Sequence, residues 1–182
     1  MDVAQAHYEV PQPPRKLSAI AGVIVSYYDV VGADIPKLHD WLEKHGPRDD
    51  QTHRVTPARS SWSIGTAVKY TKSGSQCTLA SATVKFTASA VLPRLAPGQK
   101  LASSALAYWN AYARAIEDRQ AARLSFVRDR LTEVQSAIMR SNCANWERAA
   151  SAAIDRLAQE QSQAFPPDPK TQPKLVDPES AG

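Results

Sequence analysis

Two stretches in the first half of the chain, residues 62–70 and 77–92, alternate between apolar or β-branched residues and small or polar ones. A period of two is typical of a strand with one buried face. Residues 72–76, centred on Gly74, predict a hairpin turn of the longer kind between them, and Pro93 is expected to end the second strand. The run VIVSYYDVV at residues 23–31 predicts a third strand, which Gly32 ends. These segments predict a small, mainly antiparallel sheet.

The second half of the chain repeats apolar residues at steps of three and four, which is the period of a helix. Because residues 104–140 contain neither glycine nor proline, they predict a single helix of about 35 residues and about 50 Å. Ser141 and Asn142 interrupt the pattern, and residues 144–164 predict a second helix, antiparallel to the first. A shorter helix is expected between an N-cap at Asp34 and a stop at Gly46. The predicted fold class is α+β, with the sheet packed against the long helix and its antiparallel neighbour.

Prolines mark both ends of the chain. Residues 1–16 contain three prolines and little apolar periodicity, which predicts a flexible arm. Residues 165–182 are also rich in proline, and we expect a mobile tail there. Between them, residues 17–164 predict a single globular domain, for which a chain of 182 residues is long enough.

Charge and hydropathy narrow the classes of partner. The 22 basic residues are interspersed with 18 acidic ones, so the net charge of +4 gives only weak support to a polyanion partner. No apolar run reaches the roughly 18 residues that a membrane span needs. The polar, proline-rich beginning MDVAQAHYEVPQPPRK does not resemble a signal peptide, so we expect that segment to be absent or already removed.

The chain has two cysteines, Cys77 and Cys143. They are far apart and have no Cys-x-x-Cys spacing, so neither a zinc ribbon nor a thioredoxin-type site is indicated. Spacing alone leaves two alternatives open, a disulfide in an oxidising compartment or two buried free thiols.

Several short motifs follow one another in a characteristic order. They are YYDVVG at the first strand, HGP at residues 45–47, Trp62-x-Ile64, CTLASATVKFTASAVLP, YWN at the start of the long helix, and NCANWERAASAA. In this order and spacing they resemble the bacterial domain-of-unknown-function family 922, described as predicted secreted zinc-dependent proteases. The resemblance covers about residues 26–171. It implies a zincin-like arrangement of sheet and helices, a Cys77–Cys143 disulfide, and a periplasmic or secreted location.

In that family the long helix carries His-Glu-x-x-His, whose two imidazoles can hold one zinc ion while the glutamate activates its bound water. The matching positions here begin with Arg119 and Gln120 and end with Arg123. A guanidinium has no lone pair for a metal, and a glutamine amide cannot take a proton from water. The third ligand of the family, a C-terminal histidine, is matched by Pro173. We therefore expect a pseudoprotease with no metal, no other cofactor and no catalytic residue.

The altered motif suggests a different use of the cleft. If the helix keeps the family's packing, Arg119 and Arg123 face the place where zinc would lie, and at 100° per residue Tyr112 and Arg130 fall in the same sector. Such a row could bind a carboxylate or a phosphate. The candidate ligand-binding residues are Tyr112, Arg119, Gln120, Arg123 and Arg130.

The alternative is that these arginines are neutralised within the fold. Arg130 has Glu133 three residues later, whereas Arg119 and Arg123 have no acidic residue three or four positions away. Their partners would have to come from another element, and Asp29 on the first strand is one candidate.

Three functional hypotheses follow. The leading one is a non-enzymatic cell-envelope protein that binds a peptide, a protein or an anionic envelope ligand in the former active-site cleft. The second is a zinc-dependent hydrolase with displaced ligands, for which the candidates are His39, Asp40, Glu43 and His53. The third is a polyanion binder that uses the six arginines of residues 104–140, although four acidic residues there argue against nucleic acid. The exposed faces of the long helix could also support a homodimer.

Overall fold

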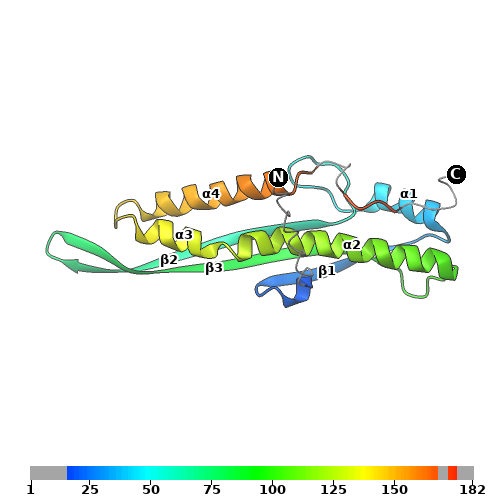
Figure 1. Ribbon diagram of the computed structural model, residues 1–182, viewed down its shortest axis with the longest axis horizontal. Helices are drawn as coiled ribbons and strands as arrows, with labels where there is room; N and C mark the ends of the chain where they lie inside the picture. Colours follow the sequence, from blue (N-terminus) through cyan, green and yellow to red (C-terminus); the bar gives the residue numbers. More distant parts are fainter. Residues whose placement is uncertain (1–15, 168–171, 176–182) are drawn as a thin grey trace, which may run out of the picture.

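The computed structural model describes residues 16–167 and 172–175, so the predicted arm at residues 1–15 lies outside the described residues. The fold is α+β: a three-stranded sheet lies against a layer of helices, and the molecule is elongated along the strands (Figure 1). A short 3₁₀ helix, η1, comes first. The elements are η1 Leu17–Ala19, β1 Val23–Val30, α1 Ile35–His45, β2 Arg59–Ser73, β3 Gln76–Leu95, α2 Ser103–Arg128, α3 Leu131–Met139 and α4 Trp146–Ala164.

The sheet is mixed, with strand order β1-β3-β2. The long strand β3 pairs antiparallel with β2 and parallel with β1. The expectation of a mainly antiparallel sheet was therefore correct for β2 and wrong for β1. The reason is connectivity: α1 and β2 lie between β1 and β3 in the sequence, and this long crossover allows the two strands to run in the same direction.

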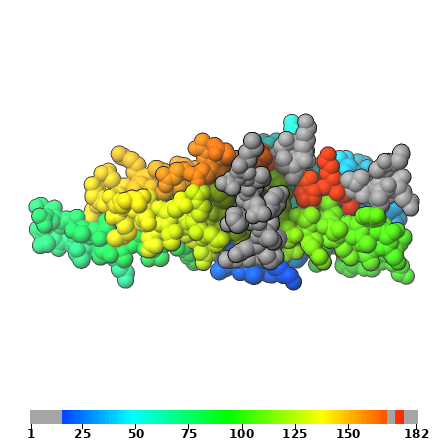
Figure 2. Space-filling model, viewed as in Figure 1, coloured from blue at the N-terminus to red at the C-terminus, as the bar shows by residue number. Residues whose placement is uncertain are grey.

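The hairpin between β2 and β3 has a two-residue loop, Gly74 and Ser75, because Ser73 pairs with Gln76. Gly74 has a φ of 59°, which glycine adopts more readily than other residues at the first position of a two-residue loop. The expected longer turn was wrong because the residues that flank the loop are polar and hide the pairing from the hydrophobic pattern. The tip of this hairpin projects beyond the helices (Figure 2).

Strand β3 does not end at Pro93 but continues to Leu95. The pairing of β2 with β3 ends at the pair formed by Arg59 and Val91, whereas β1 still pairs with Pro93 through Tyr28. Pro93 therefore lies where β3 has a neighbour on one side only. A missing backbone N–H is tolerated at such a sheet edge, so the proline does not stop the strand.

The predicted long helix is two helices, α2 and α3, separated at Asp129 and Arg130. The backbone N–H of Arg130 donates to the carbonyl of Val127, a tighter turn than the α-helix makes. The break separates two hydrophobic clusters: α2 contributes Ile116 and Leu124 to the main one, and α3 contributes to the second. Because sheets twist, we infer that one straight helix could not follow β3 along both clusters, and the break lets α3 change direction.

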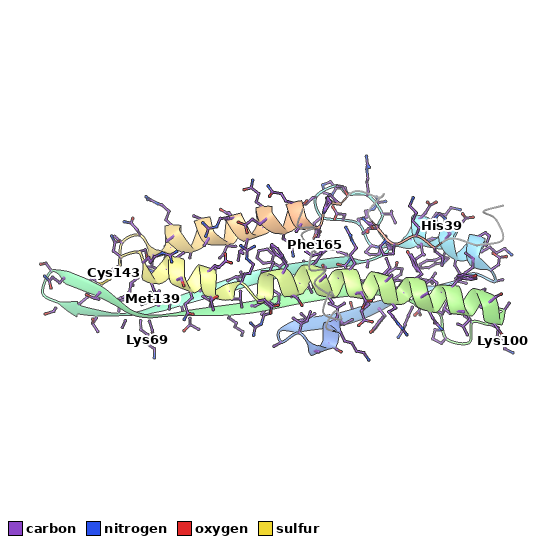
Figure 3. All side chains as sticks on the ribbon, in the orientation of Figure 1. His39, Lys69, Lys100, Met139, Cys143 and Phe165 are labelled. Carbon is purple, nitrogen blue, oxygen red and sulfur yellow. A yellow bond between two sulfur atoms is a disulfide. The ribbon has the colours of Figure 1, made fainter. Side chains whose placement is uncertain are left out.

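The second cluster lies between α3, α4 and the hairpin, and a disulfide closes this end of the molecule. Cys77 at the start of β3 is bonded to Cys143, which precedes α4, and this settles the alternative left open by the cysteine spacing. Figure 3 shows Cys143 beside Met139, far from His39 on α1. The buried residues of this cluster are Ala82, Val134, Ile138, Ala150, Ala153 and Leu157.

The described part of the proline-rich segment after α4 packs against the domain. Phe165 meets the ring of Phe126 edge-on, with 6.0 Å between ring centroids. Leu175 is only 6% exposed and belongs to the main cluster. The expectation of a mobile tail therefore does not hold for these residues. No helix of the described residues is long and apolar enough to cross a membrane.

Candidate functional site

A cavity of about 250 Å³ lies between α2, the beginning of β2 and the end of α4. Arg119, Gln120 and Arg123 line it, so three of the five candidate ligand-binding residues share one cavity. Phe165, at the end of α4 near the middle of the molecule, also lines it (Figure 3). We call this space the arginine cavity.

Arg123 is partly buried, and its side chain makes no hydrogen bond within the described residues. Its Nε is shielded from solvent. Burial and the neighbouring charge of Arg119 lower the pKa of Arg123, while Asp49 acts in the opposite direction. A guanidinium keeps its proton under these conditions, so the cavity wall carries the positive charge of Arg123, whose Nε has no hydrogen-bond partner among the described residues.

Arg119 is held by the segment that follows α4. Its Nη2 donates to the backbone carbonyl of Pro166 at 2.9 Å. Burial lowers the pKa of Arg119. This partner of Arg119 comes from another element, as expected from the lack of an acidic residue three or four positions away on α2. Asp29, the candidate from the sequence, does not contact Arg119. Asp29 instead accepts from Arg94, 2.7 Å away, across β1 and β3.

Two glutamines fix the walls of the cavity. Gln120 is 5% exposed and accepts a 2.6 Å hydrogen bond from the hydroxyl of Ser60. Gln161 on α4 accepts from Trp62 Nε1 at 3.0 Å and donates to the carbonyl of Arg123 at 2.7 Å. Each amide joins a helix to another element, so β2, α2 and α4 are locked together around the arginines.

Sequence reasoning missed two acidic residues of the site, Asp49 and Asp50, of which Asp50 pairs with Arg59 at 3.1 Å. Asp49 is the one that acts on Arg123. Its Oδ1 accepts bonds from the backbone N–H groups of Gln51 and Thr52 and from the Thr52 hydroxyl. Burial raises the pKa of Asp49, but these hydrogen bonds and the charge of Arg123 outweigh it and bring that pKa below its ordinary value. The sequence signal for Asp49 was the pattern Asp-x-x-Thr in a polar connector. This pattern is common in local turns, so it did not point to a functional site.

Gln161 was also missed, although its position carried a signal. It follows Ile154 and Leu157 at helical steps of three and four, so a polar side chain occupies the apolar stripe of α4. Such a residue must find hydrogen-bond partners when it is buried.

The structure does not bring Tyr112 and Arg130 to the arginine cavity. Tyr112 lines a second cavity, and its burial raises the pKa of its hydroxyl. Arg130 Nε lies 2.6 Å from Glu133, and its Nη2 lies 2.5 Å from Glu160 on α4. The predicted row assumed one continuous helix. Because the helix breaks between α2 and α3 at Asp129 and Arg130, Arg130 no longer faces the same side as Arg119 and Arg123.

The second cavity has a volume of about 440 Å³ and lies beside α1. It shares four lining residues with the arginine cavity: Asp49, Thr56, Pro167 and Gln172. Its other walls combine the apolar residues Leu42, Val55, Pro57, Pro173 and Leu175 with a polar rim of His39, Glu43, Thr52, Arg54 and Lys174. We call it the apolar cavity.

The residues at the positions that match the His-Glu-x-x-His motif do not fit a metal ion. Arg119 and Arg123 present only donors, and Gln120 is buried and bonded to Ser60. Pro173 has no ligand atom in its side chain. Asp168 and Thr171, which precede Pro173 in the sequence, lie outside the described residues.

Another group of potential ligands lies on α1. Ligand atoms of His39, Asp40 and Glu43 are all within 4.8 Å of one another. His39 Nε2 is 3.7 Å from Glu43, and both side chains are well exposed to solvent. His53, the fourth candidate of the hydrolase hypothesis, is not part of this group.

The fold and the site define an α+β domain with a disulfide-bonded hairpin and a cationic cavity. A family model described as bacterial protein of unknown function (DUF922) matches residues 25–165, and the chain belongs to this family. No curated protein and no solved structure matches the chain.

Proposed function

We propose that this protein is a non-enzymatic member of its family that holds a ligand carboxylate in the arginine cavity. The observation that carries the proposal is Arg123, a partly buried cation whose side chain has no hydrogen bond within the described residues. Burying the Nε donor without a hydrogen bond is costly, and a bound anion would supply one. A carboxylate suits the planar guanidinium because it can accept two parallel bonds.

The chemistry of the wall supports binding rather than catalysis. Within the described residues, Asp49 and Asp50 are the carboxylates that line the cavity. Asp49 has a lowered pKa and an Oδ1 that already accepts three bonds, and Asp50 pairs with Arg59 at 3.1 Å. A carboxylate of lowered pKa is a weak proton acceptor at neutral pH. Gln120, at the position of the family's glutamate, is held by Ser60 and cannot act as a base. We therefore propose a pseudoprotease whose former active-site cleft recognises a ligand.

The disulfide supports a place in the cell envelope or outside the cell. Cys77–Cys143 ties the hairpin to the helices, and structural disulfides form and persist in oxidising compartments. The periplasm and the extracellular space are such compartments. The proposed ligand is therefore a carboxylate that occurs there, such as a peptide or an anionic envelope component.

Binding of small carboxylates tests the proposal. Acetate and a blocked peptide with a free carboxyl end are titrated into the protein while the amide signals are followed by NMR. We expect saturable shifts at residues 119–123 and 60–62, and Arg123→Gln should weaken binding about tenfold or more, because hydrogen bonds to charged groups contribute about 1.5–3 kcal/mol.

Arg130→Gln is the matched control, because Arg130 belongs to the same helical layer but pairs with Glu133 and Glu160 away from the cavity. It should leave carboxylate binding unchanged. Equal binding by wild type and Arg123→Gln would refute the proposal. So would stoichiometric zinc in the purified protein together with proteolytic activity.

The second candidate function is a metal-dependent hydrolase at α1. The observation in its favour is the cluster of His39, Asp40 and Glu43, which borders the apolar cavity through His39 and Glu43. Activity that chelation removes, that zinc restores and that His39→Ala abolishes would establish it. The exposed His39–Glu43 contact explains the cluster more simply as the approach of two side chains one helical turn apart.

A further inference from the structure

We infer that the apolar cavity is a side-chain subsite of the same binding site, and that the ligand is a peptide with a free carboxyl end and an apolar side chain close to it. This inference rests on the proposed function, because it takes the arginine cavity as the place of the carboxylate. It adds a second site and the chemical class of the ligand.

The two cavities adjoin each other. Asp49, Thr56, Pro167 and Gln172 line both of them, so these residues form the boundary between the cation and the apolar walls. The arginine cavity alone, at about 250 Å³, is below the size of an ordinary ligand site, whereas the two together reach that range. The apolar cavity, at about 440 Å³, is within that range, so a ligand held at the arginines gains room for a side chain by extending into it.

The apolar cavity is suited to an uncharged side chain. Leu42 and Leu175, with 5% and 6% exposure, form part of its wall, and Val55 and Pro57 add further apolar surface. A leucine-sized group placed against these residues would exchange contact with water for contact with apolar surface. The burial of such a side chain corresponds to a gain in affinity of about tenfold or more.

The boundary between the cavities is polar, and this feature selects a peptide over a plain alkyl carboxylate. Thr56 donates to Ala58 at 3.1 Å and lies 3.4 Å from Gln172, so hydroxyl and amide groups face the passage. Asp49 Oδ2 accepts no hydrogen bond within the described residues and can receive a peptide N–H. An alkyl chain that crossed this boundary would desolvate these groups without replacing their hydrogen bonds, whereas a peptide backbone replaces them.

The charges of the site bear on the direction in which the peptide lies. The carboxyl end of the peptide is placed at Arg123, whose charge has no hydrogen-bonded partner within the described residues. The reverse orientation would bring a peptide amino group against Arg119 and Arg123, and like charges repel. Because Arg54 and Lys174 also line the apolar cavity, the orientation follows from the hydrogen bond that the buried Arg123 Nε lacks rather than from charge alone.

The test compares four probes by isothermal titration calorimetry. Acetyl-Ala-Leu-Leu with a free carboxyl end is compared with its C-terminal amide, with acetyl-Ala-Ser-Ser and with octanoate. We expect the first to bind about tenfold more tightly than each of the other three. Octanoate binding as tight as that of the leucine peptide would overturn the choice of a peptide.

Val55→Phe separates the subsite from the arginine cavity, because the larger ring fills the apolar cavity from a partly exposed loop position. The variant should lose the preference for leucine over serine and keep the binding of the serine peptide. If Val55→Phe does not fold, Val55→Thr replaces one methyl group with a hydroxyl at similar volume and should reduce the same preference.

The outcomes separate the two proposals. Equal affinity for the leucine and serine peptides, with both still weakened by Arg123→Gln, would overturn the subsite and leave the carboxylate site standing. Affinities that do not depend on Arg123 or on the free carboxyl group would overturn the proposed function itself.

Discussion

The side-chain amide of Gln161 donates to the backbone carbonyl of Arg123 across 2.7 Å and thereby joins α4 to α2 at the arginine cavity. The same amide accepts from the indole of Trp62. Because Gln161 is only 5% exposed, the two bonds are shielded from solvent, and their loss would leave a buried donor and a buried acceptor without partners.

We therefore expect Gln161→Leu to lower the free energy of unfolding by about 1–3 kcal/mol. Urea denaturation followed by tryptophan fluorescence measures the change. The neighbouring Gln163 is exposed, and Gln163→Leu should change the stability by less than about 0.5 kcal/mol. Similar effects of the two substitutions would show that the bridge has no special role.

The Cys77–Cys143 bond closes a loop with a sequence separation of 66 residues. In the chain-entropy model such a link stabilises the fold by about 4 kcal/mol. Reduction should therefore lower the thermal midpoint of the wild type. The thermal midpoint of a variant with Cys77→Ser and Cys143→Ser should not respond to reductant. Hydrogen exchange should accelerate first in the hairpin and α3, which the bond holds together. A midpoint that does not respond to reductant would contradict the expectation.

Local signals predicted local structure well. The helix α1 begins after Asp34, whose side chain accepts from the backbone N–H of Lys37, and ends at Gly46, as the capping residues indicated. Its apolar residues Ile35, Leu38 and Leu42 are buried. All of these interactions join residues a few positions apart, so the sequence contains the information needed to predict them.

The errors arose where distant segments decide the outcome. The direction of β1 depends on the crossover to β3, and the break near Arg130 depends on how helices follow the sheet. Neither leaves a mark in hydrophobic periodicity, because both strand directions and both helix arrangements bury the same residues. The Cys77–Cys143 pairing was predicted from the family resemblance rather than from the spacing of the cysteines.

The candidate site shows the same division. Arg119, Gln120 and Arg123 share a cavity because they lie within one turn of α2. Asp49 belongs to the connector before β2, and its approach to Arg123 follows from tertiary packing alone. Sequence reasoning stated that the partners must come from another element, but it could not show that Arg119 would bind the carbonyl of Pro166 or that Asp49 would be a carboxylate acting on Arg123.

Replacement of Arg123 should stabilise the fold while it weakens ligand binding. The charge is partly buried and its pKa is lowered first by burial and then by Arg119, so the folded state bears a cost that a neutral side chain would not. Arg123→Met keeps the aliphatic volume and should raise the free energy of unfolding by about 0.5–2 kcal/mol. Chemical denaturation without ligand measures it, and a lower stability would indicate that Arg123 has a structural role.

The lowered pKa of Asp49 makes the stability of the fold depend on pH in the acidic range. Asp49 is ordinarily protonated near pH 3.9 in an unfolded chain, and its hydrogen bonds from Thr52 and Gln51 and the charge of Arg123 favour the ionised form in the folded state. The contribution is therefore fully present above the unfolded pKa and is lost as the pH falls through the lower folded pKa. Asp49→Asn should be less stable than wild type at pH 7, and the difference should shrink as the pH falls below about 4.

Asp155→Asn is the control, because Asp155 is exposed on α4 and should show a small difference at both pH values. Urea denaturation of the three proteins between pH 7 and pH 3 measures these differences, and a gap between Asp49→Asn and wild type that stays constant with pH would contradict the assignment of the stabilisation to the ionised carboxylate.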